Sequence, residues 1–149
     1  MFQGGAHMTE EKEIQAVLDR YRTAVYSKDV DAFIGLYDED ARVFDLWGRW
    51  LYRGSAEWRK TAEEWFGSLG ADRSSPEFHD VQIEVGDGLA GVHAFVTYKG
   101  LSADGKELRS MDNRITWVLR KNRDGAWKVI HEHTSAPADF ETGKVTLRR

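Results

Sequence analysis

The sequence contains no cysteine, which excludes disulfide bonds, thiol catalysis and thiolate metal ligation. It has no apolar run of about 18 residues, so no segment is expected to span a membrane. Acidic and basic residues are interspersed and the formal net charge is -4, which argues against nucleic acid as the main partner. No signal segment is recognised, and we therefore expect a cytoplasmic protein.

What is present suits one domain with a sizeable core. The chain has 149 residues, of which 41% are hydrophobic and 12% aromatic, including six tryptophans. That composition can build a core and also line a cavity. Residues 1–7 are typical of an expression-tag remnant, so we expect the native chain to begin near Met8 and a single domain to occupy residues 8–149.

Apolar residues at helical spacing predict three helices. The first covers about residues 14–25 and is broken at Ser27, and the second covers residues 30–37 with Asp29 or Asp31 as its cap. The third follows Ser55, a candidate N-cap, and has a strongly aromatic face that runs to Leu69. Residues 70–77 are predicted to form a polar loop.

The remaining segments favour β-strands. We expect a strand over residues 42–47, a short arm over residues 50–53, and four strands over residues 78–85, 89–99, 107–120 and 127–135. Turn sequences rich in glycine, asparagine and aspartate separate the last four strands, and Pro137 ends the final one. Helices followed by an antiparallel meander predict an α+β fold, with a loosely attached tail to Arg149.

Four stretches of the chain resemble one known family. They are residues 28–32 (Lys-Asp-Val-Asp-Ala), residues 43–46 with 52–54, residues 124–137 and residues 139–143. In this order they resemble the SnoaL-like branch of the nuclear transport factor 2-like superfamily, which also holds ketosteroid isomerase-like sequences. The resemblance implies a cone of three N-terminal helices packed on a curved antiparallel sheet, and a homodimer formed through the outer sheet face.

The same resemblance implies an acid/base pair. The local contexts of Tyr21 and Asp45 are similar to those of a tyrosine and a catalytic aspartate in the steroid isomerases, so Asp45 would be a general base and Tyr21 a hydrogen-bond donor to an oxyanion. The second carboxylic acid of those enzymes falls on Ile115 here, with Asp112 and Asn113 displaced from its place. Strict steroid isomerase activity is therefore not expected.

Physical chemistry agrees with these roles but leaves alternatives. A pocket walled by Trp47, Trp58 and Trp65 would desolvate the Asp45 carboxylate and raise its pKa towards the range of a working base. Tyr21 could equally be a core residue at helical spacing, and Asp45 could make only a structural hydrogen bond.

His131, Glu132 and His133 invite a metal interpretation. On a strand both histidines point to one side and could share a metal, but a third ligand is needed and nothing selects His79 or His93. No metal site is expected. We favour a polar ladder in which Thr116 faces His131 and Arg114 faces His133, buried in a subunit interface.

Glu132 would then face the candidate cavity wall with Ile130 and Thr134, opposite Asn113, Ile115 and Trp117. A slip of one residue in register would exchange the two faces. On that wall Glu132 could form an acid/base pair with Asp45. The alternative is a salt bridge with Arg53 or Arg109.

The aromatic side chains exceed what a small core needs. Any one of them could be plain core, but we expect at least two to line a closed, mostly apolar pocket. The candidate ligand-binding residues are Trp47, Trp58, Trp65, Phe66, Asn113, Trp117 and Thr134.

Two functions remain open. In the first, the protein performs cofactor-independent acid/base chemistry of isomerase, cyclase or dehydratase type on a small hydrophobic cyclic molecule, with Asp45, Tyr21 and Glu132 as catalytic groups. In the second, it is a non-catalytic ligand-binding or dimeric association module that uses the same cone.

Overall fold

The computed structural model describes residues 3–149, with side chains from Met8 onward. Residues 1 and 2 of the expected tag remnant lie outside the described residues, and Gln3 already belongs to the first helix. The elements in chain order are α1 (Gln3–Ser27), α2 (Val30–Ile34), β1 (Tyr37–Phe44), β2 (Tyr52–Arg53), α3 (Gly54–Ser68), β3 (Arg73–Val85), β4 (Leu89–Leu101), β5 (Glu107–Lys121) and β6 (Trp127–Ser135).

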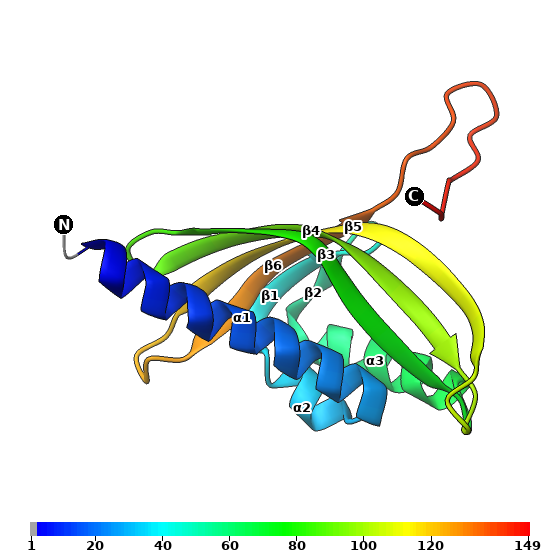
Figure 1. Cartoon of the computed structure of the whole chain (residues 1–149), viewed down its shortest axis with the longest axis horizontal. Helices are drawn as coiled ribbons and strands as arrows, with labels where there is room; N and C mark the ends of the chain where they lie inside the picture. Colours follow the sequence, from blue (N-terminus) through cyan, green and yellow to red (C-terminus); the bar gives the residue numbers. More distant parts are fainter. Residues whose placement is uncertain (1–2) are drawn as a thin grey trace.

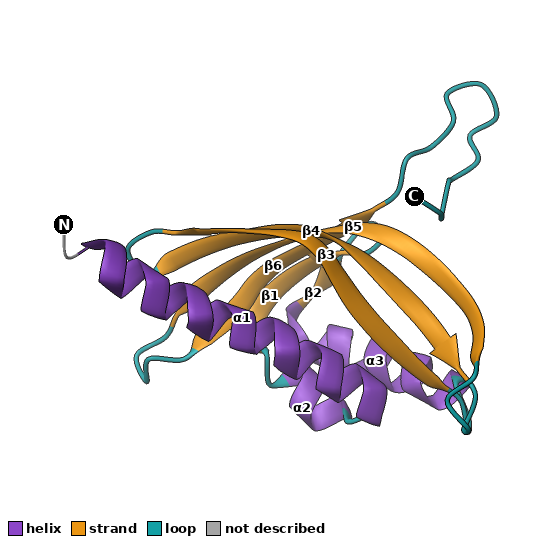
Figure 2. Ribbon diagram, in the orientation of Figure 1, coloured by secondary structure: helices purple, strands orange, loops and turns teal. Residues whose placement is uncertain are grey.

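The six strands form one curved sheet in the order β2-β1-β6-β5-β4-β3. Figure 1 shows α1 running along the concave side of this sheet. α2 and α3 lie on the same side, beyond the C-terminal half of α1. Within the described residues, the outer, convex face carries no helix (Figure 2). The predicted α+β cone is confirmed, with one refinement: β1 pairs with β6 in parallel, whereas the other strand pairs are antiparallel.

The start of the chain folds as its pattern predicts. The apolar residues of α1 point into the core from Ile14 to Val25. The helix stops after Ser27, where Lys28 has a positive φ of 55° that ends regular helical geometry. Asp29 then caps α2, because its carboxylate accepts a hydrogen bond from the Ala32 backbone N–H at 3.0 Å.

Several predicted boundaries are wrong, including the end of the second helix, which is Ile34 and not residue 37. β1 begins at Tyr37 and ends at Phe44, so Asp45 lies just after the strand and not within it. Ser55 is inside α3, whose N-cap is Arg53, because Gly54 is already helical. Residues 73–77 belong to β3 and not to a loop; β3 is an edge strand, where Pro76 can be accommodated although it lacks an N–H donor.

The pairing of β5 with β6 differs from the predicted register. Lys121 lies opposite Trp127, and an irregularity between Val118 and Leu119 adds a second one-residue shift, so His131 faces Val118. Two shifts of one residue leave the faces unchanged beyond the irregularity. Glu132 and Thr134 therefore do share the inner face with Trp117, as predicted, while Ile130 is displaced by the buried Val129.

Phe33 of α2 lies at the centre of the aromatic core. Its ring centroid is 5.3–5.6 Å from those of Tyr37, Tyr21 and Phe66, and 6.2–6.3 Å from those of Trp65 and Trp58. These rings come from all three helices and from β1. A short helix of five residues thus joins the long helix, the third helix and the sheet.

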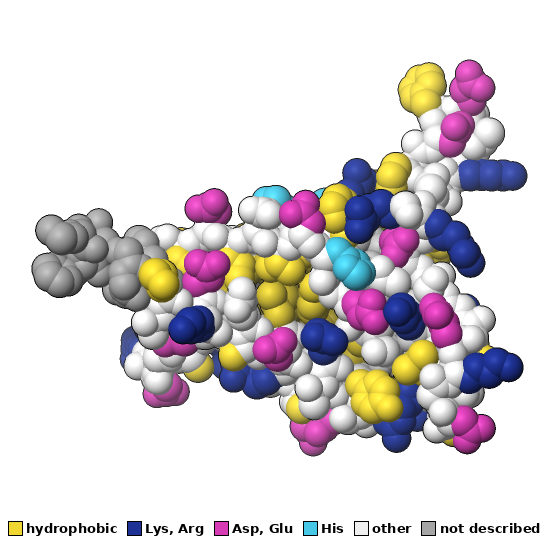
Figure 3. Space-filling model, in the orientation of Figure 1, with side chains coloured by type: hydrophobic (Ala, Val, Ile, Leu, Met, Phe, Trp, Pro, Cys, Tyr) yellow, Lys and Arg dark blue, Asp and Glu magenta, His cyan; other side chains and the backbone are white. Residues whose placement is uncertain are grey.

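The surface and the tail complete the molecule. Figure 3 shows charged side chains of both signs spread over the visible face. No helix among the described residues is long and apolar enough to cross a membrane. Residues 136–149 project from the end of β6 (Figure 1), but Asp112 on β5 holds their far end. The Asp112 N–H donates a hydrogen bond to Leu147 O, and the Asp112 carboxylate accepts one from the Arg149 N–H.

Replacing Phe33 with alanine should destabilise the protein by about 3–5 kcal/mol, because it leaves a cavity among five aromatic rings. Chemical denaturation followed by tryptophan fluorescence measures the loss. Phe140→Ala is the matched control, since Phe140 is fully exposed and its removal should change the unfolding free energy by less than about 0.5 kcal/mol. Equal effects of the two substitutions would contradict this role of Phe33.

Candidate functional site

A half-open cavity of about 650 Å³ lies between the helices and the concave face of the sheet. That volume suits a small organic molecule. Its wall combines aromatic, hydroxyl and charged side chains from α1, α3, strands β2 to β6 and the segment that follows β1. The lining residues are Tyr21, Asp45, Trp47, Gly48, Tyr52, Trp58, Thr61, Glu64, Trp65, Ser68, Leu69, Ser74, Tyr98, Gly100, Arg109, Ser110, Met111, Asn113 and Glu132.

Glu132 is a buried carboxyl group on the cavity wall. Its Oε1 accepts hydrogen bonds from the Tyr37 hydroxyl at 2.5 Å and from the Trp117 indole N–H at 2.8 Å. Burial raises the pKa of Glu132 to about 7, although the two hydrogen bonds oppose that rise by stabilising the carboxylate. The group can therefore gain or lose a proton near neutral pH.

The predicted salt bridge of Glu132 with Arg53 or Arg109 is wrong. Glu132 meets a phenol and an indole, and Arg109 instead lies 3.9 Å from Asp72. The reason is a long-range strand pairing: Tyr37 begins β1 and pairs with Val129, which brings its hydroxyl to the inner face of β6. Neutral donors satisfy the carboxyl without a second buried charge.

Asp45 lies immediately after β1, on the same cavity. Its Oδ1 accepts from the Thr134 hydroxyl at 3.0 Å and its Oδ2 accepts from the Trp47 N–H at 3.2 Å. Burial raises the pKa of Asp45 above its ordinary value, while these hydrogen bonds act in the opposite direction. Asp45 also raises the pKa of Glu132, so the two carboxyl groups influence each other's protonation.

Tyr21 reaches the cavity from α1 and pairs with Tyr98 of β4. The two hydroxyl oxygens are 2.7 Å apart, and either can be the donor. Burial, together with the neighbouring Tyr98, raises the pKa of Tyr21 well above its ordinary value, so it stays protonated and able to donate. Sequence reasoning missed Tyr98, although its alternation with the buried Ala94 and Val96 places it on the inner face.

The structure brings three of the five predicted aromatic residues to the cavity. Trp47, Trp58 and Trp65 line it, with Trp47 52% exposed at one end. Phe66 packs against Phe33 in the core behind the wall. The Trp58 N–H has no hydrogen-bond partner among the described residues. Burial and the charge of Glu132 raise the pKa of Tyr37, and Trp58 acts on that pKa in the opposite direction.

Of the other predicted binding residues, one lines the cavity and two do not. Trp117 and Thr134 do not line the cavity; they hold Glu132 and Asp45 from behind. Asn113 does line it and is only 6% exposed. The wall is mostly apolar, as predicted, but it also contains the cation Arg109 and the acid Glu64, and the cavity is partly open where a closed pocket was predicted.

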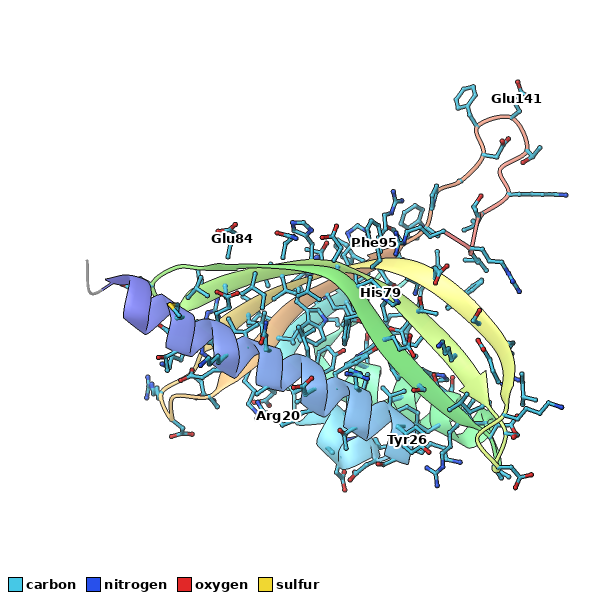
Figure 4. All side chains as sticks on the ribbon, viewed as in Figure 1. Arg20, Tyr26, His79, Glu84, Phe95 and Glu141 are labelled. Atoms are coloured by element: carbon cyan, nitrogen blue, oxygen red, sulfur yellow. The ribbon has the colours of Figure 1, made fainter. Side chains whose placement is uncertain are left out.

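His131 and His133 lie on the outer face of the sheet, away from the cavity. Phe44 packs against His131 and His133, with ring centroids 4.8 and 5.5 Å apart. His133 lies opposite Thr116, not the predicted Arg114. Figure 4 shows His79 and Phe95 on this side of the sheet as well. Within the described part of the chain, no three histidine or acidic residues are grouped to hold a metal ion.

Taken together, the cavity holds two carboxyl groups of raised pKa and a pair of buried phenols. A carboxylate of raised pKa can accept a proton, and a phenol can donate a hydrogen bond to a developing oxyanion. The site thus has the groups for proton transfer within a pocket of ligand size. A curved α+β cone with such a cavity is the architecture of the nuclear transport factor 2-like proteins.

Comparisons with known proteins agree with this architecture. The SnoaL-like domain family matches residues 14–139, and the chain therefore belongs to that family. An NTF2-like protein of unknown function from Pseudomonas putida is similar at 27% identity and a TM-score of 0.82, over 94% of this chain and 95% of that one. A comparison with curated protein sequences finds no match.

Two further solved structures share the fold. A protein of unknown function from Mycobacterium tuberculosis has 22% identity and a TM-score of 0.72, over 93% of this chain and 83% of that one. A Xanthomonas campestris protein, proposed to be a calcium/calmodulin-dependent protein kinase II association domain, has 20% identity and a TM-score of 0.71, over 84% and 86%. The family and the cavity together define a small-ligand-binding cavity protein.

Replacing Glu132 with glutamine should remove part of the pH dependence of stability. The folded-state pKa of about 7 lies above the ordinary 4.5, so the protonated group stabilises the fold below pH 4.5 and that contribution is lost as the pH rises through 7. The loss amounts to about 3 kcal/mol. Urea unfolding at several pH values should show it in the wild type and not in Glu132→Gln, which keeps an oxygen for Tyr37 and Trp117.

Asp45→Asn is the companion variant for this measurement. The raised pKa of Asp45 acts in the same direction, so its substitution should flatten the profile further, while Glu132→Gln removes the component centred near pH 7. An unchanged slope in Glu132→Gln would mean that the pKa of Glu132 is the same in the folded and unfolded states.

Proposed function

We propose that this protein binds a small cyclic molecule in its cavity and catalyses a cofactor-independent proton transfer on it. The observation that carries the proposal is that Asp45, Tyr21 and Glu132 line one cavity of ligand size. The three residues are far apart in the sequence, since Tyr21 lies in α1, Asp45 follows β1 and Glu132 lies in β6. The fold brings them to the same cavity.

Asp45 is the proposed general base. It is the more accessible of the two carboxyl groups, and two hydrogen bonds fix its orientation. It would take a proton from a carbon next to a carbonyl group. Tyr21, with Tyr98 behind it, would donate a hydrogen bond to the oxygen on which negative charge develops.

Glu132 is the proposed auxiliary acid. With a pKa of about 7 it is partly protonated at neutral pH. A proton on Glu132 reduces the negative charge next to Asp45 and Tyr98, which would favour an anionic intermediate in the cavity. Isomerisation, cyclisation and dehydration all begin with such a proton abstraction, so the proposal includes all three.

A binding-only function is the second candidate, and a specific observation favours it. Tyr21 and Tyr98 already satisfy each other, and Glu132 already accepts two hydrogen bonds. Polar groups that are engaged in this way can form a passive wall. In this case the cone is a ligand-binding or dimeric association module.

A homodimer through the convex face is part of both proposals. In the part of the chain that the structure describes, no helix covers that face, and it presents the exposed Phe44 with His131 and His133. An exposed aromatic cluster on a strand surface is a contact that a second copy could cover. Sedimentation of the purified protein measures the oligomeric state.

Deuterium exchange tests the catalytic proposal without knowledge of the natural substrate. The wild type in D₂O should accelerate the loss of the α-proton NMR signals of 2-tetralone, a flat bicyclic ketone. Asp45→Asn should lower this acceleration by about 10²–10⁴-fold, because the base is lost. Tyr21→Phe should lower it by about 10²–10³-fold, because a hydrogen bond to the enolate oxygen is lost.

Asp40→Asn is the control, since Asp40 is an exposed carboxylate of β1 and does not line the cavity. It should exchange at the wild-type rate. The affinity of Asp45→Asn for the ketone, measured by calorimetry, should stay close to that of the wild type. If the wild type binds 2-tetralone but does not accelerate exchange, the binding module is the correct function.

A further inference from the structure

Asn113 carries a buried amide that no described residue satisfies. The residue is 6% exposed, lies in the middle of β5 and lines the cavity. Its Oδ1 is fully buried and has no hydrogen-bond partner among the residues that the structure describes. Within those residues its Nδ2 makes no hydrogen bond either. Both halves of the amide are therefore unpaired.

The surroundings explain why the fold itself offers no partner. Across β4 the residue opposite is Val96, which is fully buried and apolar, and the next residue along the inner face of β5 is Ile115. Two polar groups of the wall are already engaged: Tyr98 with Tyr21, and Glu132 with Tyr37 and Trp117. Asn113 lines the cavity, so a molecule bound there can supply the partner.

An unpaired buried amide is unfavourable for folding. A buried polar group without a partner costs about 1–3 kcal/mol, and a leucine of similar shape would avoid that cost at this position. Sites at which a sequence breaks such a local rule are the ones where function is expected. At Asn113 the missing partner is most simply a group of the ligand.

We propose that Asn113 recognises a cyclic ligand that presents a hydrogen-bond donor and an acceptor side by side, as in a lactam. The inference rests on the proposed ligand-binding function and names the substrate class for that cavity. A carboxamide has one donor group and one acceptor on the same plane, so it pairs best with a planar partner of the opposite order. A lactam or an enolised dicarbonyl has that edge; a simple aromatic hydrocarbon does not.

The probes are 2-quinolone, its N-methyl derivative and naphthalene. 2-Quinolone has the N–H and C=O groups next to each other, the N-methyl derivative lacks the donor, and naphthalene lacks both. Isothermal titration calorimetry gives the three dissociation constants. The wild type should bind 2-quinolone at least about tenfold more tightly than the N-methyl compound, because loss of the donor leaves Asn113 Oδ1 unpaired again.

Asn113→Leu should bind 2-quinolone and its N-methyl derivative with about equal affinity. In the absence of ligand, the same substitution should raise Tm by about 2–4 °C. The combination distinguishes recognition from a structural role, because a structural amide would lower Tm when removed. Asn113→Val is the second variant, for the case in which leucine does not fit. Thr116→Val is the control, since Thr116 lies on the same strand but on the outer face and is exposed.

Each other outcome overturns the proposal. Equal binding of 2-quinolone and its N-methyl derivative by the wild type removes the role of Asn113 but leaves the cavity as a binding site. If both Asn113 variants still prefer 2-quinolone to its N-methyl derivative, Asn113 again has no role in recognition, and the cavity remains a binding site. If both variants lower Tm, the amide is structural. If none of the three probes binds, this ligand class is wrong, and the exchange of 2-tetralone still decides the proposed function separately.

Discussion

The parallel pairing of β1 with β6 joins the N-terminal part of the chain to the last strand of the meander. It aligns Val43 with Glu132 and Phe44 with His133, and it sends the chain directly into the segment that carries Asp45. Everything on one side of the cavity depends on this alignment, since α3 follows from β1 through the short strand β2. Without it, the hydroxyl of Tyr37 would not reach Glu132, and Asp45 would have no Thr134 beside it.

The elements with strong local signals could be predicted from the sequence. The helical spacing from Ile14 to Val25, the aspartate cap of α2 and the glycine-containing turns each act through neighbouring residues only, and the structure contains all of them. The bounds of β6 were predicted to the residue, because Trp127 follows a turn and Pro137 comes soon after the end of the strand. The inner face of β5 and β6 was also correct.

The remainder depends on contacts that no local pattern contains. The second helix was predicted to reach residue 37 and the next strand to begin at residue 42, yet residues 37–41 belong to β1, whose pairing with the distant β6 is irregular between Tyr37 and Arg42. The misplaced start of β1 hid Tyr37, and with it the true partner of Glu132. The irregularity between Val118 and Leu119 cannot be read from the sequence either, since both residues suit a regular strand.

The position of Tyr21 has a consequence for how this protein can change over evolutionary time. Its ring packs against Phe33, Phe78 and Trp117 while its hydroxyl belongs to the cavity, so one residue serves both the core and the site. A substitution of Tyr21 would therefore disturb both the packing of the core and the hydrogen bonding of the cavity. Trp47 and Arg109 are the opposite case: both line the cavity at exposed positions, where substitutions cost little stability. Related chains can therefore diverge in the molecules they accept at the rim while the interior remains constant.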